Sequence, residues 1–195
     1  AERGRPEAVA ENLGRIGKLA DRAARIIRNL RAFARNEAEP ATDVDLGDVI
    51  ADALEILAPR VERAGAVIDA PEGPLPSVHG GRVRLQQVLI NLVSNSVDAM
   101  EGQAGPRIVR IGAEAAQDRV RLTVRDSGPG LTDPDRIFDP FFTTKPVGEG
   151  LGLGLSISYG IVQSFGGDIR GENCEGGGAI FTIDLPAARG REAAA

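Results

Sequence analysis

Six glycines lie within residues 128–154, at positions 128, 130, 148, 150, 152 and 154. Glycine has no side chain, so the backbone of this segment can approach another group closely. An apolar stretch with helical spacing follows it directly, so bare backbone N–H groups would gather at a helix N-terminus, where anions are favoured. The segment therefore predicts either a phosphate-binding loop or a flexible surface loop.

Two common phosphate-binding motifs do not fit this glycine-rich segment. No Lys-Ser or Lys-Thr pair follows its last glycine, as the P-loop requires. It also lacks the βαβ surroundings of a dinucleotide-binding fingerprint. A phosphate site in this chain would therefore be of another type.

Periodicity in the rest of the chain predicts helices alternating with hairpin strands. Apolar residues recur at helical spacing over residues 46–61, 82–100 and 151–165. Asp45 is a candidate N-cap for the first of these helices. Short or alternating apolar runs predict strands at 66–69, 76–79, 107–115, 118–126, 167–173 and 178–186. Because these strands pair mainly as hairpins, we predict an α/β two-layer sandwich. It should occupy residues 46–187, with a frayed tail over 188–195.

Residues 1–35 form a separate segment with two apolar seams. The seams consist of Leu13, Ile16, Leu19, Ala20, Ala23, Ile26, Ile27, Leu30, Phe33 and Ala34. An apolar face this wide suits a helical bundle better than a two-stranded coiled coil. We expect residues 1–35 to be one helix of a hairpin that dimerises, joined to the main domain by a polar linker over 36–45.

Charge is unevenly distributed between these parts. Residues 1–35 contain nine Lys or Arg against four Asp or Glu, whereas the whole chain has a formal charge of −5. A basic arm can bind nucleic acid, anionic lipid or an acidic protein. Its basic residues recur at helical spacing beside the apolar face, which favours a solvated helix face, so we expect no nucleic-acid partner. The single cysteine excludes an internal disulfide.

Two amides interrupt the apolar pattern of the helix expected over 82–100. Asn91 and Asn95 lie four residues apart on one face, and Asp98 lies one turn further along it. A buried amide without a hydrogen-bond partner costs about 1–3 kcal/mol. Nucleotide phosphates with Mg²⁺ would supply partners, since Mg²⁺ takes oxygen ligands. Taken alone, the two amides could equally cap a neighbouring loop.

A carboxylate ends the strand expected over 118–126. Asp126 is followed by Gly128 and Gly130, which would let the backbone approach a planar ring. The carboxylate can accept a hydrogen bond from the exocyclic amine of adenine, whereas guanine presents a carbonyl there and would be repelled. A lone Asp-x-Gly-x-Gly sequence is more often a simple turn.

Four sequence blocks follow one another along the chain: "LQQVLINLVSNSVDAM" (85–100), "DSGPG" (126–130), "IFDPFFTTKP" (137–146) and "GEGLGLGLSIS" (148–158). In this order they resemble the N, G1, F and G2 boxes of the sensor histidine kinases. The end of the chain, "GGDIRGENCEGGGAIFTIDLP", is similar to the closing hairpin of that family, and residues 7–35 resemble the second helix of its dimerisation and phosphotransfer hairpin. The sequence "FFTTKPVGEGLGLGLSISYGIVQSFGG" is most similar to the subgroup that includes the dicarboxylate-sensing kinases.

The resemblance implies a catalytic domain that binds ATP and Mg²⁺. It implies that Asn95 and Asn91 lie at the metal and the phosphates, that Asp126 reads adenine, and that Lys145 in a lid meets a phosphate. Asn91, Asn95 and Lys145 would then serve the phosphoryl transfer. The residues expected to bind the nucleotide are Asn95, Asp98, Asp126, Gly128, Gly130, Lys145, Gly148, Gly150, Leu151, Gly152, Leu153 and Gly154.

One position separates kinases from the related ATPases, which carry a glutamate four residues before the Mg²⁺ asparagine to activate water. Here that position is Asn91, an amide that cannot take a proton at neutral pH. We therefore expect transfer of the γ-phosphoryl group to an incoming nucleophile. An ATPase of the same superfamily and a non-catalytic nucleotide-binding scaffold are the alternatives, and the intact Asn95 and Asp126 argue against the second.

The family's acceptor histidine has no counterpart within the sequence. His79, the only histidine, precedes the helix expected over 82–100 and is not followed by an acidic residue, so we expect it to be a loop residue. We expect the acceptor upstream of residue 1, a homodimer through the N-terminal helix, and a response regulator aspartate as the final recipient. The chain should be cytoplasmic, with any membrane anchor upstream.

Overall fold

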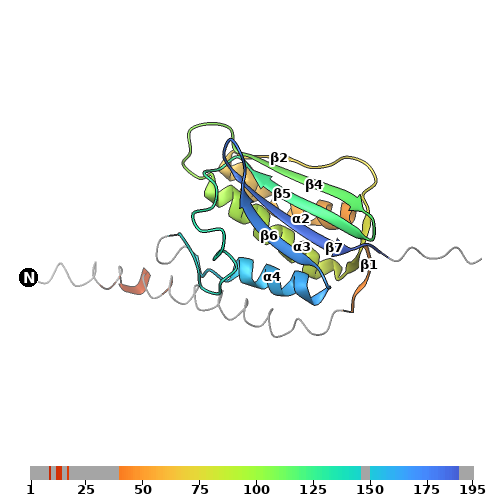
Figure 1. Ribbon diagram of the computed structural model, residues 1–195. Coiled ribbons are helices and arrows are strands. Elements are labelled where there is room, and N and C mark those ends of the chain that lie inside the picture. The colour runs from red at the N-terminus through yellow and green to blue at the C-terminus, as the bar shows by residue number, and fades with distance from the viewer. Residues whose placement is uncertain (1–8, 10–11, 15–16, 18–39, 146–149, 189–195) are drawn as a thin grey trace, which may run out of the picture. The chain divides into compact units, whose positions relative to one another are not determined.

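The computed structural model describes residues 9, 12–14, 17, 40–145 and 150–188 of the chain. The chain divides into two compact units. The smaller unit consists of Ala1–Ala38 and Lys145–Leu151, and the larger unit of Glu39–Thr144 and Gly152–Ala195. All the helices and strands labelled in Figure 1 belong to the larger unit.

The larger unit combines a mostly antiparallel sheet with three labelled helices. Its helices are α2 (Leu46–Ala64), α3 (Arg82–Ala99) and α4 (Gly154–Ser164). Its strands are β1 (Thr42–Asp45), β2 (Val67–Asp69), β3 (Ser77–Gly80), β4 (Ile108–Ala116), β5 (Arg119–Asp126), β6 (Asp168–Asn173) and β7 (Ala179–Pro186). β1 pairs with β3, and the other five strands form one sheet in the order β2-β4-β5-β7-β6.

The five-stranded sheet is antiparallel except at one edge. β2 runs parallel to β4, with Val67 opposite Ile108, and every other neighbouring pair is antiparallel. β4 and β5 form the predicted hairpin, with Ala116 opposite Arg119. Figure 1 shows α2, α3 and α4 along one face of this sheet. The predicted two-layer α/β sandwich is therefore confirmed.

The core lies between the helices and the facing side of the sheet. In α2 the buried residues recur at steps of three and four, as the sequence predicts. In β5 every second residue is buried, because successive side chains of a strand point to opposite faces. The buried residues that carry these two patterns are Leu46, Val49, Ile50, Ala53 and Leu57 of α2, and Val120, Leu122 and Val124 of β5.

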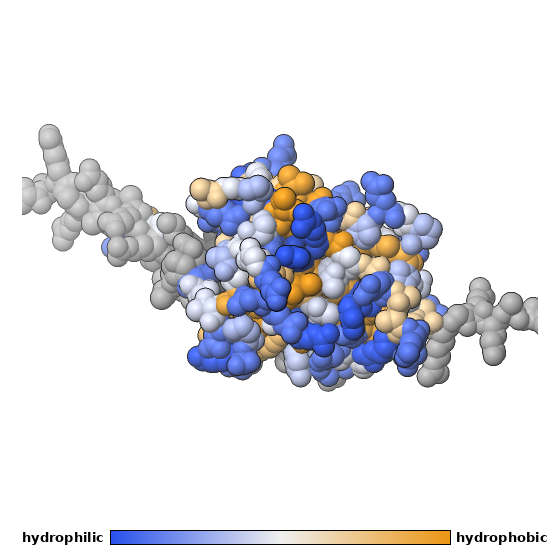
Figure 2. All heavy atoms as spheres, turned by 45° about the horizontal axis from the view of Figure 1, so that its top comes forward, coloured by the Kyte–Doolittle hydropathy of each residue, from blue (hydrophilic) through white to orange (hydrophobic). Residues whose placement is uncertain are grey.

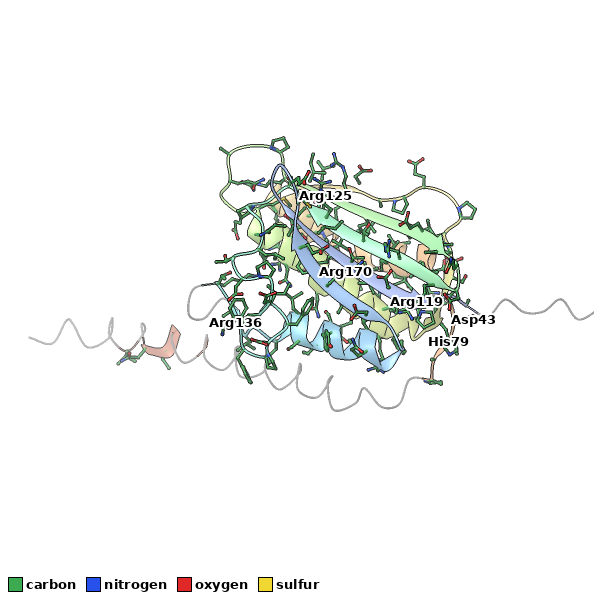
Figure 3. All side chains as sticks on the ribbon, in the orientation of Figure 1. Asp43, His79, Arg119, Arg125, Arg136 and Arg170 are labelled. Atoms are coloured by element: carbon green, nitrogen blue, oxygen red, sulfur yellow. The ribbon has the colours of Figure 1, made fainter. Side chains whose placement is uncertain are left out.

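The opposite face of the sheet is polar. Arg121, Thr123 and Arg125 alternate with the buried residues of β5, and Arg121 pairs with Asp184 of β7 at 3.0 Å. Arg125 and Arg170 are labelled on their strands in Figure 3. Figure 2 shows hydrophilic residues over much of the face that it presents, with hydrophobic areas between them.

Two segments differ from the sequence-based expectation. Thr42–Asp45, in the predicted linker, forms β1, which pairs with β3 and buries Val44. α4 begins at Gly154 rather than at residue 151. Its start is delayed because Gly152 has φ +63° and accepts a hydrogen bond from the Phe141 N–H at 2.9 Å. The chain therefore makes a close turn against residues 141–142 before it can enter the helix.

The described residues of the N-terminal segment (9, 12–14 and 17) are helical, and Leu13 is exposed. The rest of the predicted N-terminal helix, the first part of the predicted linker and nearly all of the predicted tail lie outside the described residues. Across the part of the chain that the structure describes, no helix is both long enough and apolar enough to cross a membrane.

Both ends of α2 are capped by the residues that the sequence supplies there. The Asp45 side chain accepts a hydrogen bond from the Gly47 N–H at 2.7 Å, as predicted for its N-cap. Gly65 ends the helix with φ +59°, a conformation that glycine adopts without steric cost.

Asp45→Ala removes the N-cap acceptor of α2 and should lower the free energy of unfolding by about 1 kcal/mol. Asp45→Asn keeps an acceptor of the same reach and should stay within about 0.3 kcal/mol of the parent chain. Urea unfolding followed by far-ultraviolet circular dichroism measures both. Equal losses in the two variants would mean that the carboxylate charge, rather than the cap, stabilises the helix.

Candidate functional site

The N block (residues 85–100) and the glycine block (residues 148–158) meet where α3 packs against the start of α4. The Asn91 side-chain amide donates hydrogen bonds to the Gly154 carbonyl oxygen and to Ser158 Oγ, both at 3.3 Å. Ser158 is fully buried and itself donates to the Gly154 carbonyl at 3.0 Å. Asn91 therefore joins two helices through its amide nitrogen, and its amide oxygen has no part in these bonds.

Asn95 differs from Asn91 in its surroundings. It lies one helical turn further along α3, on the same face, and its side chain is half-buried. Among the described residues the structure records no hydrogen-bond partner for its amide. A half-buried amide with unused capacity is suited to a ligand that supplies the missing partner, such as Mg²⁺ with its phosphate oxygens and waters.

Asp126 is buried at the end of β5, with 4% of its surface exposed. Its Oδ1 accepts hydrogen bonds from the Gly128 N–H at 2.9 Å and the Ala179 N–H at 3.1 Å. Its Oδ2 accepts one from Ser96 Oγ at 3.3 Å. Because a carboxylate oxygen can accept two hydrogen bonds, Oδ2 retains capacity for a further donor.

Ser96 was missed by the sequence analysis, although it follows Asn95 directly. It is 1% exposed, so its hydroxyl needs a partner, and that partner is Asp126. A serine among the apolar residues of a buried helix face was the available signal. Ser96 therefore connects α3 with the G1 block (residues 126–130), and Asn91 connects α3 with the glycine block.

Two loop contacts shape the surroundings of Asp126. Gly178 has φ +85°, and a side chain there would overlap the Asp126 carbonyl oxygen. Asn173, at the end of β6, accepts from the Leu131 N–H at 2.6 Å and donates to the Leu131 carbonyl at 3.0 Å. Gly130, with φ +88°, leaves no room for a side chain beside Asn173. Neither Gly178 nor Asn173 could be identified from local sequence pattern.

The F block is anchored to both layers of the larger unit. Ile137 is buried, and a Cβ added at Gly171 of β6 would lie only 2.5 Å from its Cδ1. The Phe138 ring lies 5.7 Å from the Tyr159 ring of α4. The Arg136 guanidinium lies 4.9 Å above the Phe142 ring. The segment from Arg136 to Phe142 is therefore held by packing.

Asp98 has a protein partner. Arg60 Nη2 of α2 donates a short hydrogen bond to Asp98 Oδ1, and the two form an ion pair. Asp98 was predicted as a nucleotide-binding residue on the same face as Asn91 and Asn95. Its pairing with Arg60, 38 positions earlier in the chain, had no signal in the local sequence.

Some predicted site residues do not belong to the larger unit. Lys145, Gly150 and Leu151 fall in the smaller unit, and Gly148 lies outside the described residues. Leu153, by contrast, is the N-cap residue of α4, and its carbonyl accepts from the Ile157 N–H at 3.0 Å. The roles predicted for these five residues remain predictions.

His79 and Arg82 also belong to the larger unit, in β3 and at the start of α3. His79 is in strand β3 rather than in a loop, and its Nδ1 lies 3.4 Å from Asp43 Oδ1 of the paired strand β1. Figure 3 labels both residues. Arg82, at the start of α3, donates hydrogen bonds to Asp52 and Asp48. The bonds with Asp52 above all raise the pKa of Arg82. Because arginine is already charged at physiological pH, no pH dependence follows.

Comparison with protein families matches residues 80–189 to the family described as "Histidine kinase-, DNA gyrase B-, and HSP90-like ATPase". Among curated proteins, the C4-dicarboxylate transport sensor protein DctB of Pseudomonas aeruginosa is 38% identical over 185 residues. That match covers 93% of this chain and 30% of DctB. The chain thus spans less than a third of that relative.

Solved structures share the fold, among them structures of histidine kinase ThkA. The nucleotide-free catalytic domain of histidine kinase ThkA has a TM-score of 0.65 and 32% identity, over 76% of this chain and 96% of that one. A complex of ThkA with the response regulator protein TrrA has a TM-score of 0.68 and 27% identity, over 86% and 48%. Full-length ShkA in complex with AMPPNP has a TM-score of 0.74 and 29% identity, over 92% and 39%.

The chain therefore belongs to the histidine kinase-, DNA gyrase B- and HSP90-like ATPase family. Among the proteins that match it, DctB is a C4-dicarboxylate transport sensor protein, TmoS of Ectopseudomonas mendocina is a sensor histidine kinase, and ThkA is a histidine kinase. This confirms the resemblance to the sensor histidine kinases that the four sequence blocks indicated.

The two asparagines should differ in their effect on stability. Asn91→Ala removes both hydrogen bonds to α4 and should lower the free energy of unfolding by about 1–2 kcal/mol. Asn95→Ala removes an amide without a recorded partner, and should stay within about 0.5 kcal/mol of the parent chain. Urea denaturation of both variants without nucleotide tests this contrast. A larger loss at Asn95 would reveal a structural role for that amide.

Proposed function

We propose that this chain is the ATP-binding catalytic part of a sensor histidine kinase. It binds ATP with Mg²⁺ and transfers the γ-phosphoryl group to a histidine outside this sequence. One observation supports this above the others: α3 brings the N block, the G1 block and the end of the glycine block together through Asn91, Ser96 and their partners. Phosphoryl transfer depends mainly on positioning and charge stabilisation, which such a preformed site supplies.

Asp126 is proposed to select adenine. Its Oδ1 is occupied by two backbone N–H groups, which fix the carboxylate plane, and Oδ2 retains acceptor capacity. The exocyclic amine of adenine can donate to Oδ2. Guanine would bring a carbonyl oxygen to the same place, leaving two acceptors in contact without a proton between them.

Asn95 and the amide oxygen of Asn91 are proposed to hold Mg²⁺ and the phosphates. The Asn91 nitrogen is engaged with α4, so its oxygen is directed by bonds that already exist without the nucleotide. Bound Mg²⁺ would neutralise charge on the phosphates. The glycines at 150, 152 and 154, with Lys145, are proposed to contact the phosphates.

Asn91 also favours transfer over hydrolysis. It occupies the position of the water-activating glutamate in the related ATPases, and its amide is neutral and engaged as a hydrogen-bond donor. An amide cannot accept a proton from water at neutral pH. A hydrolysing ATPase is therefore the less supported function for this chain.

The assignment extends to partners. ThkA has been crystallised with a response regulator protein, which supports a receiver aspartate as the final acceptor here. The N-terminal helix is proposed to dimerise through its wide apolar face. The catalytic chain is proposed to act in the cytoplasm.

The purified chain should bind Mg-ATP more tightly than Mg-GTP. Asp126→Asn introduces a donor beside the base and should reduce that preference by about tenfold, since it removes a charge-assisted hydrogen bond. Isothermal titration calorimetry of both nucleotides measures the preference, and adenosine binding reports on the pocket without the phosphates. Equal affinity of the parent chain for ATP and GTP would overturn the assignment of Asp126.

The chain alone should not be labelled by γ-labelled ATP, because its one histidine is not in a position to accept the phosphoryl group. It should label, in trans, a purified hairpin that carries the family's acceptor helix. That labelling should be weak, since the tether that raises the effective concentration is missing. His79→Ala should change neither result, and Asn95→Ala should abolish the labelling in trans.

An acid-labile label on the chain itself, lost in His79→Ala, would show that His79 is the acceptor. Rapid phosphate release without any acceptor would move the protein to the ATPase branch of the family.

A further inference from the structure

Asp98 introduces a charge conflict into the proposed nucleotide site. It lies three residues after Asn95 on the same face of α3, about 4.5 Å further along the axis. A carboxylate there repels phosphate groups held at Asn95, because like charges at short range are unfavourable. Mg²⁺ at Asn95 would offset part of this repulsion, and a second cation close to the carboxylate would offset more of it.

The structure supplies this cation from α2. Arg60 Nη2 donates to Asp98 Oδ1, and the Arg60 side chain is 44% exposed while that of Asp98 is 21% exposed. The pair thus lies at the rim of the helix layer. Exposed ion pairs contribute little to stability, so stability alone gives little reason for this one.

Arg60 has more donors than Asp98 uses. A guanidinium carries five N–H groups in a planar fork that suits bidentate contact with a phosphate. Within the described residues, the structure records a hydrogen bond from Nη2 to Asp98 as the only one that the Arg60 side chain makes. Because the guanidinium is planar and Asp98 orients it, the remaining N–H groups of Arg60 are oriented as well.

Arg60 is also fixed by the fold. It lies within α2, four residues before the last residue of the helix, and Leu57, one turn earlier, is buried in the core. Lys145, the cation predicted from the lid, belongs to the smaller unit. Arg60 is therefore a cation of the same compact unit as Asn95 and Asp126.

We propose that Arg60 is a phosphate-binding residue of the nucleotide site and that Asp98 is the residue that positions it. The inference rests on the proposed function, because it requires a nucleotide with its phosphates beside Asn95. In this arrangement Asp98 does not contact the nucleotide as the sequence predicted. It holds the guanidinium, and the guanidinium meets the phosphates.

The test compares Arg60→Gln with Arg63→Gln. Arg63 lies on the same helix three residues later, and its Nε donates to the Pro59 carbonyl at 3.0 Å. The two variants therefore lose the same charge from the same end of α2, but only the first loses the contact with Asp98. Calorimetry at constant ionic strength measures binding of Mg-ATP and of adenosine, and thermal unfolding checks that each variant is folded.

Arg60→Gln should weaken Mg-ATP binding by about tenfold or more, the value of a charge-assisted hydrogen bond, and leave adenosine binding within about twofold. Arg63→Gln should leave both within about twofold of the parent. Arg60→Lys, which keeps the charge, should restore part of the loss. The double variant Arg60→Gln, Asp98→Asn should bind Mg-ATP more tightly than Arg60→Gln and less tightly than the parent.

Several results would overturn the proposal. Unchanged Mg-ATP affinity in Arg60→Gln would show that the guanidinium does not meet the phosphates, and so would an equal loss in Arg63→Gln. Full recovery in the double variant would show that Arg60 only neutralises Asp98. If the parent chain itself failed to bind Mg-ATP, the proposed function would fail first, which separates the two failures.

Discussion

The buried carboxylate of Asp126 is the constraint on which the arrangement of the larger unit depends. A carboxylate removed from water must be hydrogen-bonded, because leaving it unpaired costs several kcal/mol. Its donors come from three different elements: Ser96 of α3, Gly128 of the following turn and Ala179 of β7. The helix cannot rotate, the turn cannot open and the strand cannot slide without breaking one of these bonds.

Asn91 adds a second tie, from the same helix to α4. Between the two ties lies Asn95, whose amide has no partner recorded within the described ranges. The fixed neighbours hold α3 in one orientation and leave this face for a ligand. A site organised before binding loses less conformational freedom when the ligand arrives.

Elements with a local signal could be predicted from the sequence. The α2 face repeats at helical spacing and Asp45 stands at its N-cap, and the β4–β5 hairpin alternates over both strands. What depended on distant partners could not be predicted. β1 buries one residue, Val44, and acquires its structure by pairing with β3.

The candidate site shows the same division. The residue types and the order of the four sequence blocks could be predicted, because residue chemistry and spacing are local properties. The first residue of α4 could not be predicted, because the apolar pattern continues through residues 151–153 although the chain turns against Phe142 at Gly152. The Arg60–Asp98 ion pair could not be predicted either, because the local sequence of each helix does not indicate which residue of the other helix it contacts.

The three glycines at 176–178, all with positive φ, are the last residues of the exposed turn that connects β6 with β7. Exposed turns usually tolerate added residues. Here the residue directly after the turn, Ala179, donates its N–H to Asp126. One inserted residue would replace that donor. If the insertion also shifted the register of β7 by one residue, Phe181 and Ile183 would turn from the core toward solvent. The length of this exposed turn is therefore under the same constraint as the base pocket, although no side chain of the turn need contact the base.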